Sequence, residues 1–360
     1  MFSASWNTLT SRAPPRRWST SRWLALAASL AGCDGGAPDR DAGTAPPDAG
    51  SAVDSGAAGG TLSVILEAED TITDGIAAGD TGAVIRDGWM VAFDSYVVVI
   101  GDIDVHLATD EGVEAEAPEL YAVDLVSVSE AGLPLWTLTG LQTGRWEFNY
   151  AIGGAGDGAT RHDSVPEPVF AEMVAEDATY LISGELSRPD GQSCPPSAVA
   201  TPGAAVANGN TNANGEPCYD NPTIGFRLLI PAETAFGPCE IDEVPGFAIT
   251  GGGATTVAAT VHGDHLFFNG FPEGDEGGVT RLAQWLADCD LNVDGEVTRA
   301  ELELVAPADL AELDARFQLG GSPITPLQDM WDYVTAQVKT QGHFQGEGEC
   351  PFDGLAHMHD

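Results

Sequence analysis

The chain has 360 residues, of which 55 are aspartate or glutamate and only 14 are lysine or arginine, and its formal net charge is −41 at pH 7. A surface this negative repels nucleic acid and anionic lipid headgroups, which argues against both as partners, and it attracts cations. The length suits two modest domains or one large domain with an appendage.

Residues 1–32 have the features of an export signal. An apolar run, WLALAASLAG, ends directly before Cys33, and no acidic residue precedes that cysteine. The run is preceded by basic residues, Arg12, Arg16, Arg17 and Arg22. It is too short to cross a bilayer as a mature helix, but its length fits the core of a signal peptide. The residues Leu30-Ala31-Gly32-Cys33 resemble the lipobox of bacterial lipoproteins, which implies cleavage before Cys33 and lipidation of its thiol; an ordinary secretory signal is the alternative.

Residues 33–60 are expected to form a disordered tether. The segment consists mostly of Gly, Ala, Asp, Pro and Ser, and Val53 is its one large aliphatic residue. Such a composition buries too little apolar surface to offset the entropy lost on ordering. We therefore expect an exported protein that contacts the cell membrane or outer membrane through its lipid anchor alone, on a face that the sequence does not specify.

The cysteines that follow the lipobox are expected to pair, because oxidising compartments favour disulfides. Cys194 and Cys218 bracket a loop rich in Ala, Asn and Pro that has little means of ordering itself, so we expect a disulfide there. We expect Cys239 to pair with Cys350 and to clip the C-terminal segment onto the main domain. Cys289 is then left as a small buried residue, although its exchange with either member of the second pair stays open.

Residues 61–271 alternate strand-like runs with Gly, Asp and Pro turn signals. The runs are TLSVILEAE, WMVAFDSYVVVIGDIDVHL, LYAVDLV, LPLWTLTGL, GRWEFNYAIGG, ATYLISGELSR, TIGFRLLIPA and TTVAATVHGDHLFF. In GRWEFNYAI, the residues Trp146, Phe148 and Tyr150 alternate with polar residues, which is the period of a half-buried strand. Because strands do not alternate with helices, we predict a mainly β domain, an antiparallel β-sandwich, with a barrel as the alternative.

Residues 275–342 are predicted to form a C-terminal α-helical, EF-hand-like module, followed by a tail at 343–360. Apolar residues recur at helical spacing in GVTRLAQWLADCD, TRAELELVAPADLAELDARF and PLQDMWDYVTAQVKTQ. The boundary falls at Pro272-Glu273-Gly274, where the strand pattern stops.

The segment DLNVDGEVTRAE, residues 290–301, places oxygen-bearing side chains at alternating positions between two of these helical stretches. Its spacing resembles a single EF-hand loop, with Gly295 at the sharp turn and Glu301 able to bind bidentately from the next helix. The resemblance implies one Ca²⁺ held by Asp290, Asn292, Asp294, Glu296 (through its carbonyl), Thr298 and Glu301. An Asx-rich turn and a dockerin-type loop are the alternatives. Because the sequence contains a single EF-hand-like loop and no second loop to pair with it, we expect calcium to stabilise the helical module.

Histidines form a second candidate metal site, with His262 and His265 in TVHGDHLFF and His343 in QGHFQGEGEC. Imidazoles beside a carboxylate can hold Zn²⁺ or Cu²⁺. Residues three apart on a straight strand point to opposite faces, so His262 and His265 converge only if the chain bends at Gly263. A disulfide to the C-terminal segment would return His343 to the same region. The alternative is local hydrogen bonding at a strand end.

The sequence contains no nucleophile elbow, cysteine-nucleophile pattern or phosphate-binding motif, so we expect a non-enzymatic, calcium-binding envelope lipoprotein. The second hypothesis is a transition-metal binding or acquisition protein that uses the histidines, with calcium purely structural. The third is a surface glycan-binding or glycoside-hydrolysing protein, because two catalytic carboxylates from distant strands leave no local signature.

Overall fold

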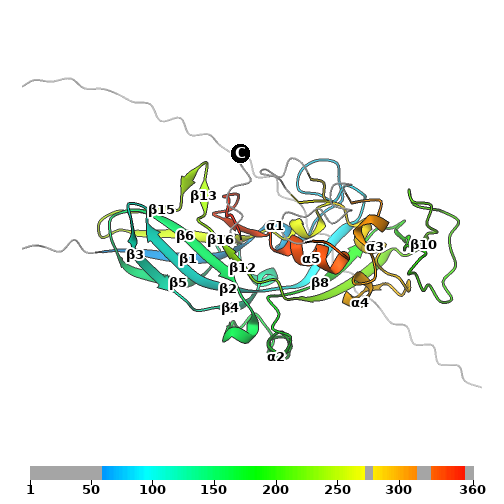
Figure 1. Cartoon of the computed structure of the whole chain (residues 1–360), viewed down its shortest axis with the longest axis horizontal. Coiled ribbons are helices and arrows are strands. Elements are labelled where there is room, and N and C mark those ends of the chain that lie inside the picture. The colour runs from blue at the N-terminus through cyan, green and yellow to red at the C-terminus, as the bar shows by residue number, and fades with distance from the viewer. Residues whose placement is uncertain (1–58, 272–278, 314–325, 353–360) are drawn as a thin grey trace, which may run out of the picture. The chain divides into compact units, whose positions relative to one another are not determined.

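The computed structural model describes residues 59–271, 279–313 and 326–352 (Figure 1). The predicted export signal, Cys33 and nearly all of the tether therefore lie outside the described residues, as do the boundary at 272–274 and the last residues of the tail. The described part is mainly β, as predicted, and contains several sheets, one of which curls into a half-barrel. Among the helices described, none has both the length and the apolar character needed to cross a bilayer.

The largest sheet is built around one long strand, β2 (Met90–Leu107). The other strands of this sheet are β3 (Asp110–Ala117), β4 (Tyr121–Asp124), β6 (Gly144–Ile152), β7 (Thr160–Arg161), β8 (Tyr180–Ser187), β11 (Thr223–Ile230), β12 (Thr234–Phe236), β15 (Phe247–Ile249) and β17 (Glu296–Val297). Its central path runs β12-β6-β2-β8-β11-β17. Most pairs are antiparallel, but β11 with β17 and β4 with β7 are parallel.

A second sheet has four strands, β1 (Gly60–Ala68), β5 (Leu133–Leu141), β16 (Ala254–Val261) and β18 (Gly342–Phe344), in the order β18-β16-β1-β5. Its central pair, β1 and β16, is parallel. Two short ribbons pair β9 (Gln192–Ser193) with β10 (Tyr219–Asp220) and β13 (Glu240–Ile241) with β14 (Val244–Pro245). Each of the eight predicted strand-like runs contains a strand, although the last continues into a 3-10 helix.

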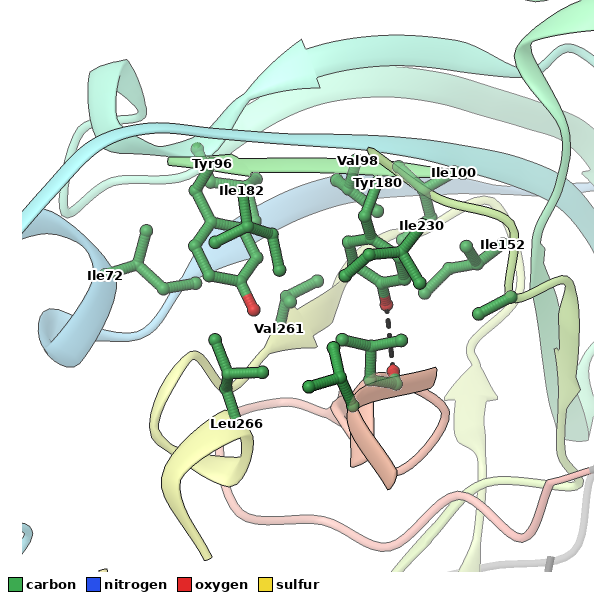
Figure 2. Close-up of a cluster of buried hydrophobic side chains, with 14 of the residues drawn as sticks. Ile72, Tyr96, Val98, Ile100, Ile152, Tyr180, Ile182, Ile230, Val261 and Leu266 are labelled. Carbon is green, nitrogen blue, oxygen red and sulfur yellow. Dashed lines mark hydrogen bonds between the residues drawn. The ribbon is translucent and has the colours of Figure 1, made fainter. Parts of the chain in front are cut away.

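Alternating apolar residues bury one face of each sheet in a common core. In β1 every second residue is buried, as Leu62, Val64 and Leu66 show, and β6 buries its aromatic residues in the predicted alternation. Residues of both sheets belong to one continuous apolar cluster. Figure 2 shows side chains of β2 and β8 facing Val261, at the end of β16. Burial of this apolar surface is the main force that holds the two sheets together.

The middle of β2 is buried on both faces. Its inward residues join the main core, whereas Val97 and Val99 pack with Met173 of α2 (Glu167–Ala175) in a smaller cluster on the other face. This double burial explains why the run YVVVI is continuously apolar and does not alternate. The other short helices before β16 are α1 (Asp70–Thr73), η1 (Leu125–Ser127) and η2 (Ala155–Asp157).

The predicted helical module is not evident within residues 279–313 and 326–352. The helices there are short: α3 (Gln284–Ala287), α4 (Arg299–Leu302), η5 (Pro307–Asp309) and α5 (Met330–Val338). Their apolar residues, such as Trp285 and Val334, belong to the main cluster. The Tyr180 hydroxyl of β8 donates a hydrogen bond to the Val338 carbonyl at 3.2 Å (Figure 2). The apolar residues of these helices therefore belong to the core of the sheets, although Trp285 of α3 also packs against Tyr333 of α5 with the ring centroids 5.7 Å apart. The apolar spacing alone could not distinguish this arrangement from a separate helical core.

Both predicted disulfides are present, and they join Cys194 to Cys218 and Cys239 to Cys350. Cys289 is free and buried, as expected. The second bond spans 111 residues and ties the segment after β18 to the start of β13.

Candidate metal centre

Three histidines from different elements meet beside the end of β16. His262 follows β16 directly, His265 lies in η3 (Asp264–Phe267), and His343 is the middle residue of β18. One candidate ligand atom from each ring lies within 4.8 Å of the other two. The rings of His262 and His343 are stacked with their centroids 3.9 Å apart, and the ring of His265 stands edge-on, 5.5 Å from His262 and 5.1 Å from His343. The structure thus brings together the three histidines that the sequence singled out, in a group that could hold a metal ion.

The chain bends at Gly263, as convergence of His262 and His265 requires. Gly263 leaves the strand conformation with φ −76° and ψ −24°, angles that any residue can adopt. A Cβ atom at this position would lie 2.4 Å from Cγ1 of Ile72 in α1. Glycine is therefore needed for the close approach of α1, and its conformational freedom is not the reason.

The pairing of β18 with β16 places His343 beside His262. β18 runs antiparallel to β16 with His343 opposite Thr260, and the His262 amide donates to the Gln341 carbonyl at 3.0 Å. The Tyr150 hydroxyl donates to the His343 carbonyl at 3.1 Å. Register and hydrogen bonds together fix this backbone beside His262.

Hydrogen bonds assign a proton and a lone pair to the rings of two of the histidines. Nε2 of His262 lies 3.0 Å from the Gly346 carbonyl oxygen, which only accepts, so Nε2 carries a proton, and in the neutral ring this leaves the lone pair on Nδ1. Nδ1 of His265 lies 2.9 Å from Oγ1 of Thr340, and that hydroxyl donates to the Gln337 carbonyl at 2.8 Å. Nδ1 of His265 is therefore the donor, and in the neutral ring this leaves the lone pair on Nε2.

His343 is the third histidine of the group. Its Nδ1 is buried and has no hydrogen-bond partner among the residues described. Burial lowers the pKa of His343 well below its ordinary value, and the neighbouring His262 and His265 lower it further. The ring is therefore neutral, which is the form of imidazole that binds metal ions. Metal-binding histidines commonly donate their outer N–H to a carbonyl or similar acceptor, as His262 and His265 do here.

A second group of ligand side chains, Glu69, His262 and Asp264, overlaps the first at His262. Oε2 of Glu69 lies 3.9 Å from Nδ1 of His262. Asp264 is fully buried and forms an ion pair with Arg281, so its charge is already compensated. A cation in this second group would lie close to a guanidinium, which makes the histidine group the better candidate. Glu69 adds a negative charge beside it.

The predicted calcium loop, residues 290–301, runs from the end of α3 through β17 into α4. Asp290 is buried and accepts hydrogen bonds from the Gly295 amide at 2.9 Å and from the Asn221 side chain at 2.8 Å, and burial raises its pKa. Glu301 is buried too and forms a capping box with Thr298 at the start of α4. These two carboxylates, at the ends of the loop, are thus engaged in hydrogen bonds within the protein.

The remaining predicted ligands of this loop, Asn292, Asp294, Glu296 and Thr298, are exposed. In the part of the chain that the structure describes, the groups of His, Cys, Asp and Glu gathered within 4.8 Å both contain His262, and neither includes a residue of this loop. Calcium binding here therefore stays a prediction.

Several residues around the histidines were not singled out from the sequence. Glu69, Thr340 and Gly346 reach the site from the end of β1, the end of α5 and the turn after β18. No local motif marks them, because each acts through a contact between segments far apart in the chain.

A scan against protein-family models and searches of curated proteins and of solved structures found no match to this chain. Its function is therefore inferred from its residues and their geometry.

Proposed function

We propose that this protein binds a transition-metal ion, Zn²⁺ or Cu²⁺, at His262, His265 and His343. The convergence of three imidazoles within 4.8 Å carries the proposal. Imidazole suits zinc and copper among the biological metals. Three protein ligands leave a coordination position open for water or another ligand, unlike a closed four-ligand structural site. An open position suits a protein that takes up its metal and passes it on.

We infer that the binding takes place outside the cytoplasm, on a protein anchored by lipidated Cys33. The two disulfides support export, since such bonds persist in oxidising compartments. The lipobox-like Leu30-Ala31-Gly32-Cys33 and the tether after it support the anchor. The two main sheets are best described as a modified β-sandwich, because both contribute to one apolar cluster although some strand pairs are parallel.

Titration of the purified protein with Zn²⁺ in competition with a chromophoric chelator tests the metal site. We expect one site, and His343→Ala should weaken it by more than about 100-fold, because even loss of an outer partner of a ligand costs 10–100-fold. The matched control is His162→Ala, which removes an imidazole that bonds Ser164 elsewhere. Equal affinities for the unmodified protein and His343→Ala would exclude the site.

A second candidate function, Ca²⁺ binding at residues 290–301, is supported by the placement of Asp290 and Glu301. These two carboxylates are buried at the two ends of the loop. Gly295, at the sharp turn, has φ +87°. Val297, at the eighth position, pairs in parallel with Phe226 of β11. Through this pair, a bound ion would stabilise the connection of the loop to the large sheet.

Calorimetric titration with Ca²⁺ should give saturable binding to one site at roughly 10⁻⁴ to 10⁻³ M, the range of extracellular modules. Glu301→Gln should abolish the binding, because it removes the bidentate carboxylate. Glu303→Gln is the control, since it makes the same change in charge at an exposed position two residues away. No heat at millimolar Ca²⁺, in a protein that carries no calcium through purification, would show that the loop is only a turn.

A further inference from the structure

Glu69 lies on the metal-binding side of His262. The parallel register of β1 with β16 ends at Ala68 opposite Val261, so the next residues along the two strands, Glu69 and His262, lie side by side. Oε2 of Glu69 is 3.9 Å from Nδ1 of His262, the nitrogen that has the lone pair in the neutral ring. The other ring nitrogen, Nε2, is bonded to the Gly346 carbonyl. The carboxylate is therefore on the side of the ring where a metal ion would bind.

The backbone of Glu69 is fixed at both of its polar groups. Its amide donates to the Val261 carbonyl at 3.1 Å, which continues the strand pairing, and its carbonyl accepts from the Ile72 amide at 2.9 Å at the start of α1. Ile72 is buried in the main core and anchors this helix (Figure 2). The Thr71 hydroxyl donates to Oε2 of Glu69 and orients the carboxylate. Because the residue is positioned before an ion binds, little conformational entropy is lost when it becomes a ligand.

A short rotation of the Glu69 side chain would bring its carboxylate into a zinc coordination shell. Two tetrahedral zinc ligands, each 2.0–2.1 Å from the ion, are about 3.3–3.4 Å apart, and the observed separation between Oε2 of Glu69 and Nδ1 of His262 is 3.9 Å. Glu69 belongs to one ligand group and His265 and His343 to the other, and the two groups share His262. The Glu69 side chain is 21% exposed, so it has room to turn toward the other two rings.

The charges beside His262 favour an ion that is compensated by Glu69. His262 and His265 are each 2% exposed, and an ion held there by neutral imidazoles alone would keep its full charge in a buried place, which is costly. Asp264 shares a ligand group with Glu69, and its buried Oδ1 has no hydrogen-bond partner among the residues described. Arg281 pairs with the other oxygen and compensates the charge of Asp264. Glu69 is thus left to supply the negative charge that the ion requires.

We propose that Glu69 is the fourth ligand of the metal site and that its charge makes the site prefer divalent cations to Cu⁺, an inference that rests on the proposed metal-binding function. The carboxylate takes the position that the three histidines leave open. At the same distance, its Coulomb attraction is about twice as large for Zn²⁺ as for Cu⁺. A carboxylate oxygen is also unlike the soft thiolate and thioether ligands that select Cu⁺. Because the side chain is partly exposed, another ligand can displace it, and the position stays exchangeable.

Competition titrations of the purified protein with Zn²⁺, and with Cu⁺ kept reduced by ascorbate, test this proposal in the variant Glu69→Gln. The amide oxygen of glutamine can still accept from Thr71, so the local hydrogen bond is kept while the charge is lost. We expect the Zn²⁺ affinity to fall at least about tenfold, the lower end of the cost of losing even an outer partner of a ligand. The Cu⁺ affinity should change by less than about threefold, because Cu⁺ has half the charge and does not favour oxygen ligands.

The control is Asp70→Asn, which removes the same charge at the next position along the chain, where the side chain is exposed. It should bind both ions as the unmodified protein does. Equal Zn²⁺ affinities in Glu69→Gln and Asp70→Asn would overturn the role of Glu69 while leaving the three histidines as the metal site. Equal losses of Zn²⁺ and Cu⁺ affinity in Glu69→Gln would overturn it too, because a distorted site and not a missing charge would then explain them. If the unmodified protein bound no Zn²⁺ at all, the metal-binding function itself would be overturned, and the role of Glu69 with it.

Discussion

Replacing both Cys239 and Cys350 with alanine should lower the free energy of unfolding by about 2–5 kcal/mol and weaken Zn²⁺ binding about 10–100-fold. The stability loss is expected because the disulfide closes a loop of 111 residues and so restricts the unfolded chain. The affinity loss has a different cause. The bond holds the segment that contains Gly346, whose carbonyl accepts from His262, and this segment follows directly on β18, which contains His343.

The other disulfide provides the control. Cys194 and Cys218 are 24 residues apart, so their replacement by alanine should cost roughly 1 kcal/mol less than the first pair. Neither cysteine contacts the histidine group, and Zn²⁺ affinity should be unchanged. Chemical denaturation and chelator competition on the two double variants measure both quantities. If the two variants bound Zn²⁺ equally well, the segment after β18 would have no part in shaping the site.

Gly263→Ala should weaken Zn²⁺ binding at least about tenfold and destabilise the protein by about 1–3 kcal/mol, the usual cost of overpacking. The added methyl group would lie 2.4 Å from Cγ1 of Ile72, so either α1 or η3 must move. Movement of η3 shifts His265 relative to His262. Gly79→Ala is the control, because its nearest neighbour, a methyl group of Val84, lies 3.4 Å from the added carbon.

Ile72→Ala, combined with Gly263→Ala, separates the clash from other effects of the new side chain. Removing the atoms in the way should restore the Zn²⁺ affinity, while the stability stays low because a core side chain has been truncated. Gly263→Ala with unchanged affinity, or a double variant no better than the single one, would show that the close contact with α1 does not set the geometry of the histidines.

Local patterns predicted the strands well, because β-branched and aromatic runs such as that around Trp146 are buried on one face in the period that strands require. The local patterns did not predict the structure correctly where the burial of a residue depends on a segment far away in the sequence. The stripe around Trp331 and Val334 was interpreted as one helix of a separate module, but it packs against the same core as the sheets. The acidic run 110–117 was not predicted as a strand, yet it pairs with β2.

The histidine group shows the same limit. The three-residue spacing of His262 and His265 made their convergence depend on a bend at Gly263, which the structure contains, and the expected disulfide indicated the return of His343. The alternative, local hydrogen bonding at a strand end, does not describe these rings, since His262 bonds Gly346, 84 residues away along the chain. The residues that set the tautomers, Thr340 and Gly346, depend on tertiary contacts that no local spacing reports.

X-ray absorption at the zinc edge tests most directly whether the three histidines bind the metal; it is measured on the purified protein loaded with one equivalent of Zn²⁺ and on its His343→Ala variant. Zinc bound by His262, His265 and His343 should give a first shell that includes three imidazole nitrogens at about 2.0–2.1 Å, one of which is lost in the variant. A shell of oxygen atoms alone, unchanged in His343→Ala, would contradict it and place the zinc among the surface carboxylates.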